Sequence, residues 1–129
     1  ASVFSHETAL YLLGLAEREP IVFSVTLKAG ANATGLRKDG VKVYRVQERL
    51  LGEGVVDAVS PSGHPLKTYN AERTICDLFR SRSGIDVQDL QAAVKGYIRR
   101  QKKNIPLLLR YAKEFRVEKF VRQYLEVLL

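Results

Sequence analysis

The residues best placed to do chemistry lie in one stretch near the middle of the chain, Tyr69–Arg80 (YNAERTICDLFR). Arg73, Asp77 and Arg80 are spaced at i, i+4 and i+7, which places them on one side of a helix as a ladder of alternating charge. Glu72 falls in the first turn, where a carboxylate favours the positive end of the helix dipole. One interpretation is a solvent-exposed ionic face. The other is a functional motif, and that interpretation depends on the rest of the chain.

A second candidate site is the densest run of cations in the chain. It holds five basic side chains without an interleaved acid: Lys95, Arg99, Arg100, Lys102 and Lys103. At helical spacing, Lys95, Arg99 and Lys102 share one outer face. Five cations within nine residues are more than solvation requires, which favours an anion-binding role. The alternative is ordinary solvation of a helix surface.

Motifs of the common enzyme classes are absent from the sequence. Two histidines and one cysteine are too few to argue a Ser-His-Asp or Cys-His site, and no His-Glu-x-x-His pattern occurs. Gly30 and Gly35 have the spacing of a phosphate-binding loop. However, Leu36 and Arg37 stand where that loop requires Lys and then Ser or Thr. The sequence therefore predicts a protein that is not an enzyme and uses neither a metal nor another cofactor.

The composition predicts one soluble domain of a reducing cytoplasm. The chain has 129 residues, of which 46% are hydrophobic and 27% charged, and no apolar run approaches the ~20 residues that span a bilayer. Cys76 is the only cysteine, which excludes an internal disulfide. The formal net charge of +7 favours a polyanionic partner or an acidic protein surface.

The elements that must position these residues divide the chain into a strand-rich front half and a helical back half. The front half is expected to form one helix and then four strands, over residues 6–17, 21–28, 41–46, 55–59 and 66–69. A loop is expected over residues 29–40, and a short helical turn over residues 47–51.

Three capping residues mark the helices of the back half. Asn70, Asp86 and Asn104 each precede an apolar stripe of helical period, and we expect the second of these helices to run to about Lys103. A last helix with a clean period follows from Val117. The sequence thus predicts an α+β fold over residues 1–129 as a single domain. Its small mixed or antiparallel sheet of about four strands would be covered by four to five helices.

Three segments, taken in order, resemble the C-terminal domain of AbiEi-type antitoxins. They are the opening Ser5–Leu15 (SHETALYLLGL), the central Tyr69–Leu78 with its core Glu72–Asp77 (ERTICD), and the end of the chain. The end matches at Asn104, at Tyr111-Ala112-Lys113 and at Tyr124–Leu129 (YLEVLL). The resemblance covers essentially the whole chain and is specific in combination, whereas each fragment alone is weak.

The resemblance implies a bacterial transcriptional regulator of a type IV toxin–antitoxin system, which acts in abortive infection, a defence against phage. Such a protein neutralises a nucleotidyltransferase-like toxin and represses its own operon. In that family an N-terminal winged helix-turn-helix domain binds the operator, and the C-terminal domain is required for antitoxin activity. This chain begins where the second domain should begin, so we expect operator binding to depend mainly on a domain that it lacks.

On this interpretation, Glu72, Arg73 and Asp77 form the motif of the antitoxicity face, and the five cations of residues 95–103 contact the DNA backbone. The expected partners are the toxin and DNA, with no membrane. Two alternatives stay open. The chain is a stand-alone nucleic-acid-binding regulator, or it is an enzyme that covalently modifies the toxin and uses Asp77 or Glu72 near a nucleotide.

Overall fold

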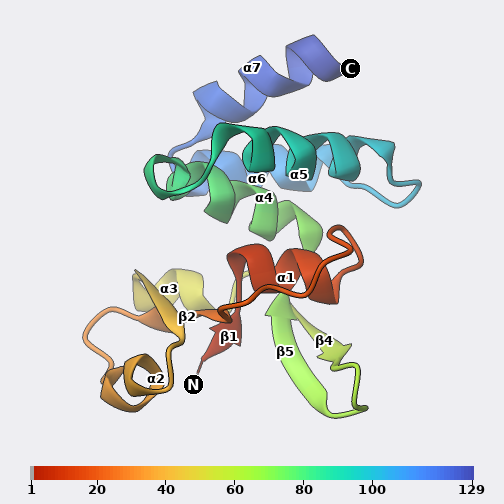
Figure 1. The fold of residues 1–129 in the computed structure, drawn as a ribbon. Helices are drawn as coiled ribbons and strands as arrows, with labels where there is room; N and C mark the ends of the chain where they lie inside the picture. Colours follow the sequence, from red (N-terminus) through yellow and green to blue (C-terminus); the bar gives the residue numbers. More distant parts are fainter. Residues whose placement is uncertain (1) are drawn as a thin grey trace. The chain divides into compact units, whose positions relative to one another are not determined.

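The computed structural model describes residues 2–129, and the chain folds into two compact units, Ala1–Asn70 and Ala71–Leu129 (Figure 1). Within the described residues, the first unit holds a five-stranded mixed sheet and three short α-helices, and the second holds four α-helices and one 3-10 turn. The predicted α+β class, with a mixed sheet and a helical C-terminal part, is confirmed. The expectation that residues 1–129 act as a single domain stays a prediction.

The sheet of the first unit has the strand order β3-β2-β1-β5-β4. Its strands are β1 (Val3–Phe4), β2 (Ser24–Lys28), β3 (Lys42–Val46), β4 (Val55–Val59) and β5 (Pro65–Tyr69). The central strand β1 is antiparallel to β2 and parallel to β5, while β2 and β3 are parallel and β4 and β5 form an antiparallel hairpin. The four predicted strands are present. The sequence does not predict β1, because two residues are too few for an alternating pattern to appear.

Two expectations about the helices of this unit are wrong. The helices are α1 (His6–Leu12), α2 (Thr34–Lys38) and α3 (Glu48–Leu51). The first ends five residues before the predicted residue 17, because Gly14 adopts a left-handed φ of 75° and the amide of Leu15 turns back to bond the carbonyl of Leu10 at 2.8 Å. The expected loop over residues 29–40 contains α2, whose start is fixed by the side chain of Asn32, which accepts from the Thr34 amide at 2.9 Å.

Hydroxyl groups fix α1 onto the sheet. The Ser24 hydroxyl donates to the carbonyl of Ser5 at 2.7 Å, and the Ser24 amide donates to the Thr8 hydroxyl at 2.9 Å. His6 is buried beside them, with its ring stacked on Tyr44 at a centroid distance of 3.5 Å. This packing holds His6 at a φ of 54°, a conformation that a residue other than glycine adopts only at a cost in free energy.

The second unit contains the predicted helices. They are α4 (Ala71–Arg80), α5 (Val87–Arg99), α6 (Ile105–Glu114) and α7 (Glu118–Leu128), with a 3-10 turn, η1 (Arg82–Gly84), after α4. Two predicted caps are confirmed: the carboxylate of Asp86 accepts from the Gln88 amide at 2.7 Å, and the side chain of Asn104 accepts from the Leu107 amide at 3.0 Å. The predicted continuation of α5 to Lys103 is wrong.

Helix α4 contacts each of the other three α-helices of this unit, α5, α6 and α7. Every residue from Ala71 to Phe79 is buried. The other helices supply the apolar residues of the core, Leu90, Ala93, Val94, Tyr97, Leu108, Tyr111, Ala112, Val121 and Leu125. Among residues 2–129, no helix combines the length and apolar character needed to cross a membrane.

Candidate functional site

The charged side of α4 forms a buried ion pair. The Nε atom of Arg73 lies 3.2 Å and 3.3 Å from the two carboxylate oxygens of Asp77, and the two residues are 0% and 2% exposed. The guanidinium carbon of Arg73 also lies 4.5 Å from the ring centroid of Phe115, a cation–π contact. The expected solvent-exposed ladder is therefore wrong, since of its three members only Arg80 is exposed.

The surroundings of α4 explain this difference. Its apolar residues follow the predicted stripe, but the helix packs against three others, so its charged side also meets protein instead of water. Periodicity records which positions of a helix are apolar; it does not record how many other helices surround it.

Burial and the charge of Arg73 act in opposite directions on the pKa of the Asp77 carboxyl group. Burial raises the pKa of Asp77 to about 6, and the positive charge of Arg73 opposes that rise. At neutral pH the carboxylate is ionised and accepts from the guanidinium.

The stability of the protein is expected to fall as pH rises through the pKa of Asp77. The folded value of about 6 is above the ordinary value of 3.8, so the folded state binds the proton more tightly. This contribution is fully present below pH 3.8 and is lost as pH rises through about 6. It amounts to about 3 kcal/mol at ~1.4 kcal/mol per pKa unit. Denaturant unfolding of the wild type and of Asp77→Asn across pH 4 to 7 measures it. Other titrations cancel in the difference, and a difference that is flat or rises with pH contradicts the shift.

Glu72 joins two distant points of the helical unit. One of its carboxylate oxygens accepts from the hydroxyl of Tyr97 at 2.6 Å and from the backbone amide of Asn104 at 3.1 Å. That amide is also 3.1 Å from the Tyr97 hydroxyl. Burial is the larger cause that raises the pKa of Tyr97, and the hydrogen bond to Glu72 raises it further. The Tyr97 hydroxyl therefore stays protonated and acts as a donor. Tyr97 lies in the last turn of α5 and Asn104 caps α6, so Glu72 fixes both ends of the connection between these helices.

We call residues 98–103, which lie between these two anchors, the cationic segment. It contains four of the five predicted DNA contacts, Arg99, Arg100, Lys102 and Lys103, and the fifth, Lys95, lies one helical turn earlier on α5. All are exposed except Arg100, which is partly buried. No ion pair formed within residues 2–129 involves any of the five.

The predicted single row of Lys95, Arg99 and Lys102 on one helix face is wrong. Helix α5 ends at Arg99, and Arg100 is extended, so Lys102 and Lys103 belong to the connection. The Lys103 ammonium donates to the carbonyl of Arg100 at 2.9 Å. The cations are thus presented on the end of a helix and the turn that follows it.

The positive charge of the protein belongs almost entirely to the helical unit. Residues 71–129 contain 13 of the 21 Lys and Arg residues and 7 of the 14 Asp and Glu residues, which gives +6 of the total +7. The strand-rich unit is nearly neutral. A polyanion or an acidic protein is therefore attracted mainly to the helical unit.

The predicted motif residues form an internal framework. Glu72, Arg73 and Asp77 are buried and bonded to side chains or backbone of their own unit, so none of them offers its charge to solvent. Their assigned role in antitoxin activity stays a prediction, and on this geometry they would act by holding the helices in place. Glu72 contacts Tyr97 and Asn104, which are 25 and 32 residues away along the chain, so no pattern of neighbouring residues predicts these contacts.

The remaining reactive groups have ordinary surroundings. Cys76 is buried, burial raises the pKa of its thiol, and its sulfur donates to the carbonyl of Leu108 at 3.7 Å. His64 lies exposed in the β4–β5 turn, with Nδ1 2.9 Å from the Ser62 hydroxyl. In the part of the chain that the structure describes, no three His, Cys, Asp or Glu side chains are grouped as ligands for a metal ion.

Comparison with known proteins found no family model and no curated protein that matches this chain. The functional argument therefore depends on the residues themselves and on the resemblance carried by their motifs.

Proposed function

We propose that this chain is a bacterial antitoxin domain of the AbiEi type, which neutralises a nucleotidyltransferase-like toxin in the cytoplasm. It is not an enzyme in this proposal, and its basic surface assists operator binding and negative autoregulation. One observation carries the proposal. Glu72 and Asn104 belong to two matching fragments that are far apart in the sequence, and the Asn104 amide donates to the Glu72 carboxylate at 3.1 Å. The contact shows that two of the matching fragments belong to one framework within the helical unit, which supports the resemblance better than separate short matches do.

The surroundings of the motif carboxylates favour a binding role over catalysis. Glu72 and Asp77 are the residues that a toxin-modifying enzyme would need near a nucleotide. Each is buried, and each is engaged within its own unit, by Tyr97 and by Arg73 respectively. A carboxylate that positions a reacting hydroxyl must lie within hydrogen-bond reach of it. Both oxygens of Asp77 are engaged by Arg73, and one oxygen of Glu72 accepts from Tyr97 and from the Asn104 amide.

Rescue of growth tests the proposal. The toxin is induced in bacteria that also express this chain, from an independent promoter, and colonies are counted. Restored colony formation is expected, with no change in the mass of the toxin recovered from the cells. Failure to restore growth, although the folded chain accumulates, rejects the antitoxin function. Added mass on the toxin favours the enzyme alternative instead.

A second candidate, a nucleic-acid-binding module, is favoured by the exposed cations that form no ion pair. Charge reversal at Lys102 and Lys103 to Glu is expected to weaken binding of duplex DNA at all sequences and to lower the salt slope by about 1 per lost phosphate contact. Reversal at Lys113 and Lys119, exposed on α6 and α7, changes the net charge equally and serves as the control. Fluorescence anisotropy at several salt concentrations measures the DNA affinity and the salt slope of each variant.

The same variants separate the two candidate functions. If Lys102→Glu/Lys103→Glu still rescues growth while DNA binding is weakened, antitoxicity does not depend on DNA contacts. If rescue is lost together with DNA binding, whereas the control pair retains both, the nucleic-acid-binding module is the better account.

A further inference from the structure

The strand-rich unit contains a pocket with a volume of about 470 Å³, a size typical of small-molecule sites. Its walls come from β1, α1, the segment between α1 and β2, and the β4–β5 hairpin. The hydrogen bonds from Ser24 to Ser5 and Thr8 fix α1 onto the sheet, so these walls are in place before any ligand binds.

Three aromatic rings line this pocket. They come from Phe4 of β1, from Tyr11 of α1 and from Phe23, which directly precedes β2. The rings of Phe4 and Phe23 pack edge-to-face at a centroid distance of 6.3 Å, and Phe23 is still 45% exposed, so a ligand can reach its ring. The face of an aromatic ring carries partial negative charge, and it therefore attracts organic cations as well as apolar groups.

The turn between β4 and β5 supplies a polar wall that is fixed by its own hydrogen bonds. The Ser60 hydroxyl accepts from the His64 amide at 3.0 Å, and Nδ1 of His64 lies 2.9 Å from the Ser62 hydroxyl. All three residues line the pocket. A wall that is already ordered loses little conformational entropy when a ligand binds.

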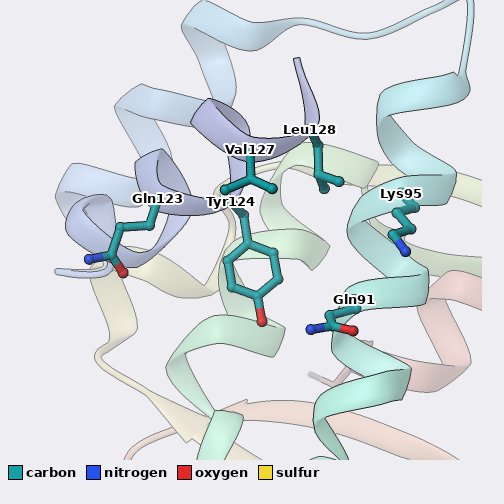
Figure 2. Close-up of a pocket in the computed structure, with 6 residues that line it drawn as sticks. All are labelled: Gln91, Lys95, Gln123, Tyr124, Val127 and Leu128. Carbon is teal, nitrogen blue, oxygen red and sulfur yellow. The ribbon is translucent and has the colours of Figure 1, made fainter.

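The charge of this pocket is opposite to that of the chain. Among the described residues that line it, Glu19 alone carries a formal charge, and Glu19 is exposed and forms no ion pair within residues 2–129. A cleft of about 410 Å³ between α5 and α7 of the helical unit is instead lined by Lys95 and by no acidic residue (Figure 2). In a chain of net charge +7, a pocket lined by a carboxylate without Lys or Arg favours a cation over an anion.

We propose that this pocket of the strand-rich unit binds a small organic cation, an amine attached to an apolar body. The ammonium group pairs with Glu19 and lies against the aromatic rings, while the body packs on Phe4, Phe23 and Leu66. A phosphate would meet the Glu19 carboxylate with no cation to offset it. The inference does not depend on the proposed function, because no residue of the pocket belongs to the buried motif or to the cationic segment.

Three probes that share a phenyl ring and a two-carbon chain test the proposal. They are 2-phenylethylamine, 2-phenylethanol and 3-phenylpropanoate, each titrated into the intact chain at pH 7 and followed by NMR of the backbone amides. The amine is protonated at this pH and is expected to bind about fivefold more tightly than the alcohol, with the carboxylate the weakest. The amide signals of lining residues such as Phe23 and His64 are expected to shift.

Two variants and a matched control test whether the pocket causes this preference. Glu19→Gln removes the charge and keeps the size of the side chain, so it is expected to lower the affinity for the amine to that for the alcohol. Glu17→Gln removes an equal charge at an exposed position outside the lining and is expected to bind the amine as the wild type does. Phe23→Leu removes a ring and is expected to weaken binding of the amine about threefold. Circular dichroism melting checks that each variant stays folded.

Several results would overturn the proposal. They are equal binding of the amine and the alcohol, tightest binding of the carboxylate, and a preference for the amine that Glu19→Gln retains. Shifts confined to residues outside the pocket, or shifts that do not saturate, overturn it as well. If a capped pentapeptide with a central Phe-Lys pair binds at least tenfold more tightly than 2-phenylethylamine, the occupant is a segment of a protein, and the small-molecule proposal is wrong.

Discussion

Replacing Asp77 by alanine is expected to lower the free energy of unfolding by about 3–5 kcal/mol, the usual cost of removing one partner from a buried ion pair. The guanidinium of Arg73 is fully buried, and its Nε donates to both oxygens of the lost carboxylate. Urea unfolding at neutral pH measures the loss. For a small domain a change of this size removes much of the total stability, so rescue of growth is expected to fail as well.

Two further variants test whether the unpaired charge of Arg73 causes the loss of stability in Asp77→Ala. Asp77→Asn keeps an oxygen that can accept from Arg73, so it should cost less than Asp77→Ala. The double variant Arg73→Met/Asp77→Leu removes both charges and fills the space with apolar atoms, and it should also be more stable than Asp77→Ala. Unchanged unfolding of Asp77→Ala together with full rescue would leave this part of the motif without a role.

Glu72→Ala is expected to cost about 1–3 kcal/mol, since it leaves the buried Tyr97 hydroxyl without its acceptor. The Asn104 amide adds less, because it is only partly buried and keeps the Tyr97 hydroxyl as an acceptor at 3.1 Å. Tyr97 is fully buried, so water has little access to its hydroxyl. Besides the loss in unfolding free energy, faster hydrogen exchange is expected at the Asn104 amide. Thermal unfolding and amide exchange measured by NMR check these two effects.

A double-mutant cycle tests whether the network acts as a unit. Tyr97→Phe alone should cost less than Glu72→Ala, because Glu72 keeps the bond from Asn104. The combination of both substitutions should cost less than the two single effects added together, with a coupling of about 1 kcal/mol. Additive effects would show that Glu72 and Tyr97 contribute separately. If Glu72→Ala stays folded but binds DNA more weakly than the wild type, the contacts of Glu72 to Tyr97 and Asn104 position the cationic segment.

Local signals in the sequence were sufficient to predict most of the elements. Asp86 and Asn104 cap α5 and α6 as expected, and the alternation of residues 41–46 correctly predicted β3. These features depend on neighbouring residues along the chain, so a pattern can record them. The end of α1 was also encoded locally, by Gly14, but the apolar residues around it favoured a longer helix.

Features that depend on distant residues could not be predicted in this way. The spacing of Arg73 and Asp77 correctly indicates that they lie one turn apart, but it is silent on the three helices that surround them. Tyr97 looks like an apolar core residue, and no pattern records that its hydroxyl meets Glu72. Similarly, β1 becomes a strand only because β2 and β5 flank it. The motif was found from the sequence, whereas its buried position required the fold.

The anchoring of the cationic segment has a consequence for how such a chain diverges and how it can be engineered. One carboxylate holds Tyr97 on one side and Asn104 on the other, and the residues of the turn between them, Gln101, Lys102 and Lys103, are exposed. Substitutions there alter what the surface attracts while the helices keep their contacts. We therefore expect this connection to tolerate substitutions and short insertions. A short epitope inserted between Gln101 and Lys102 would be displayed to an antibody without unfolding its host.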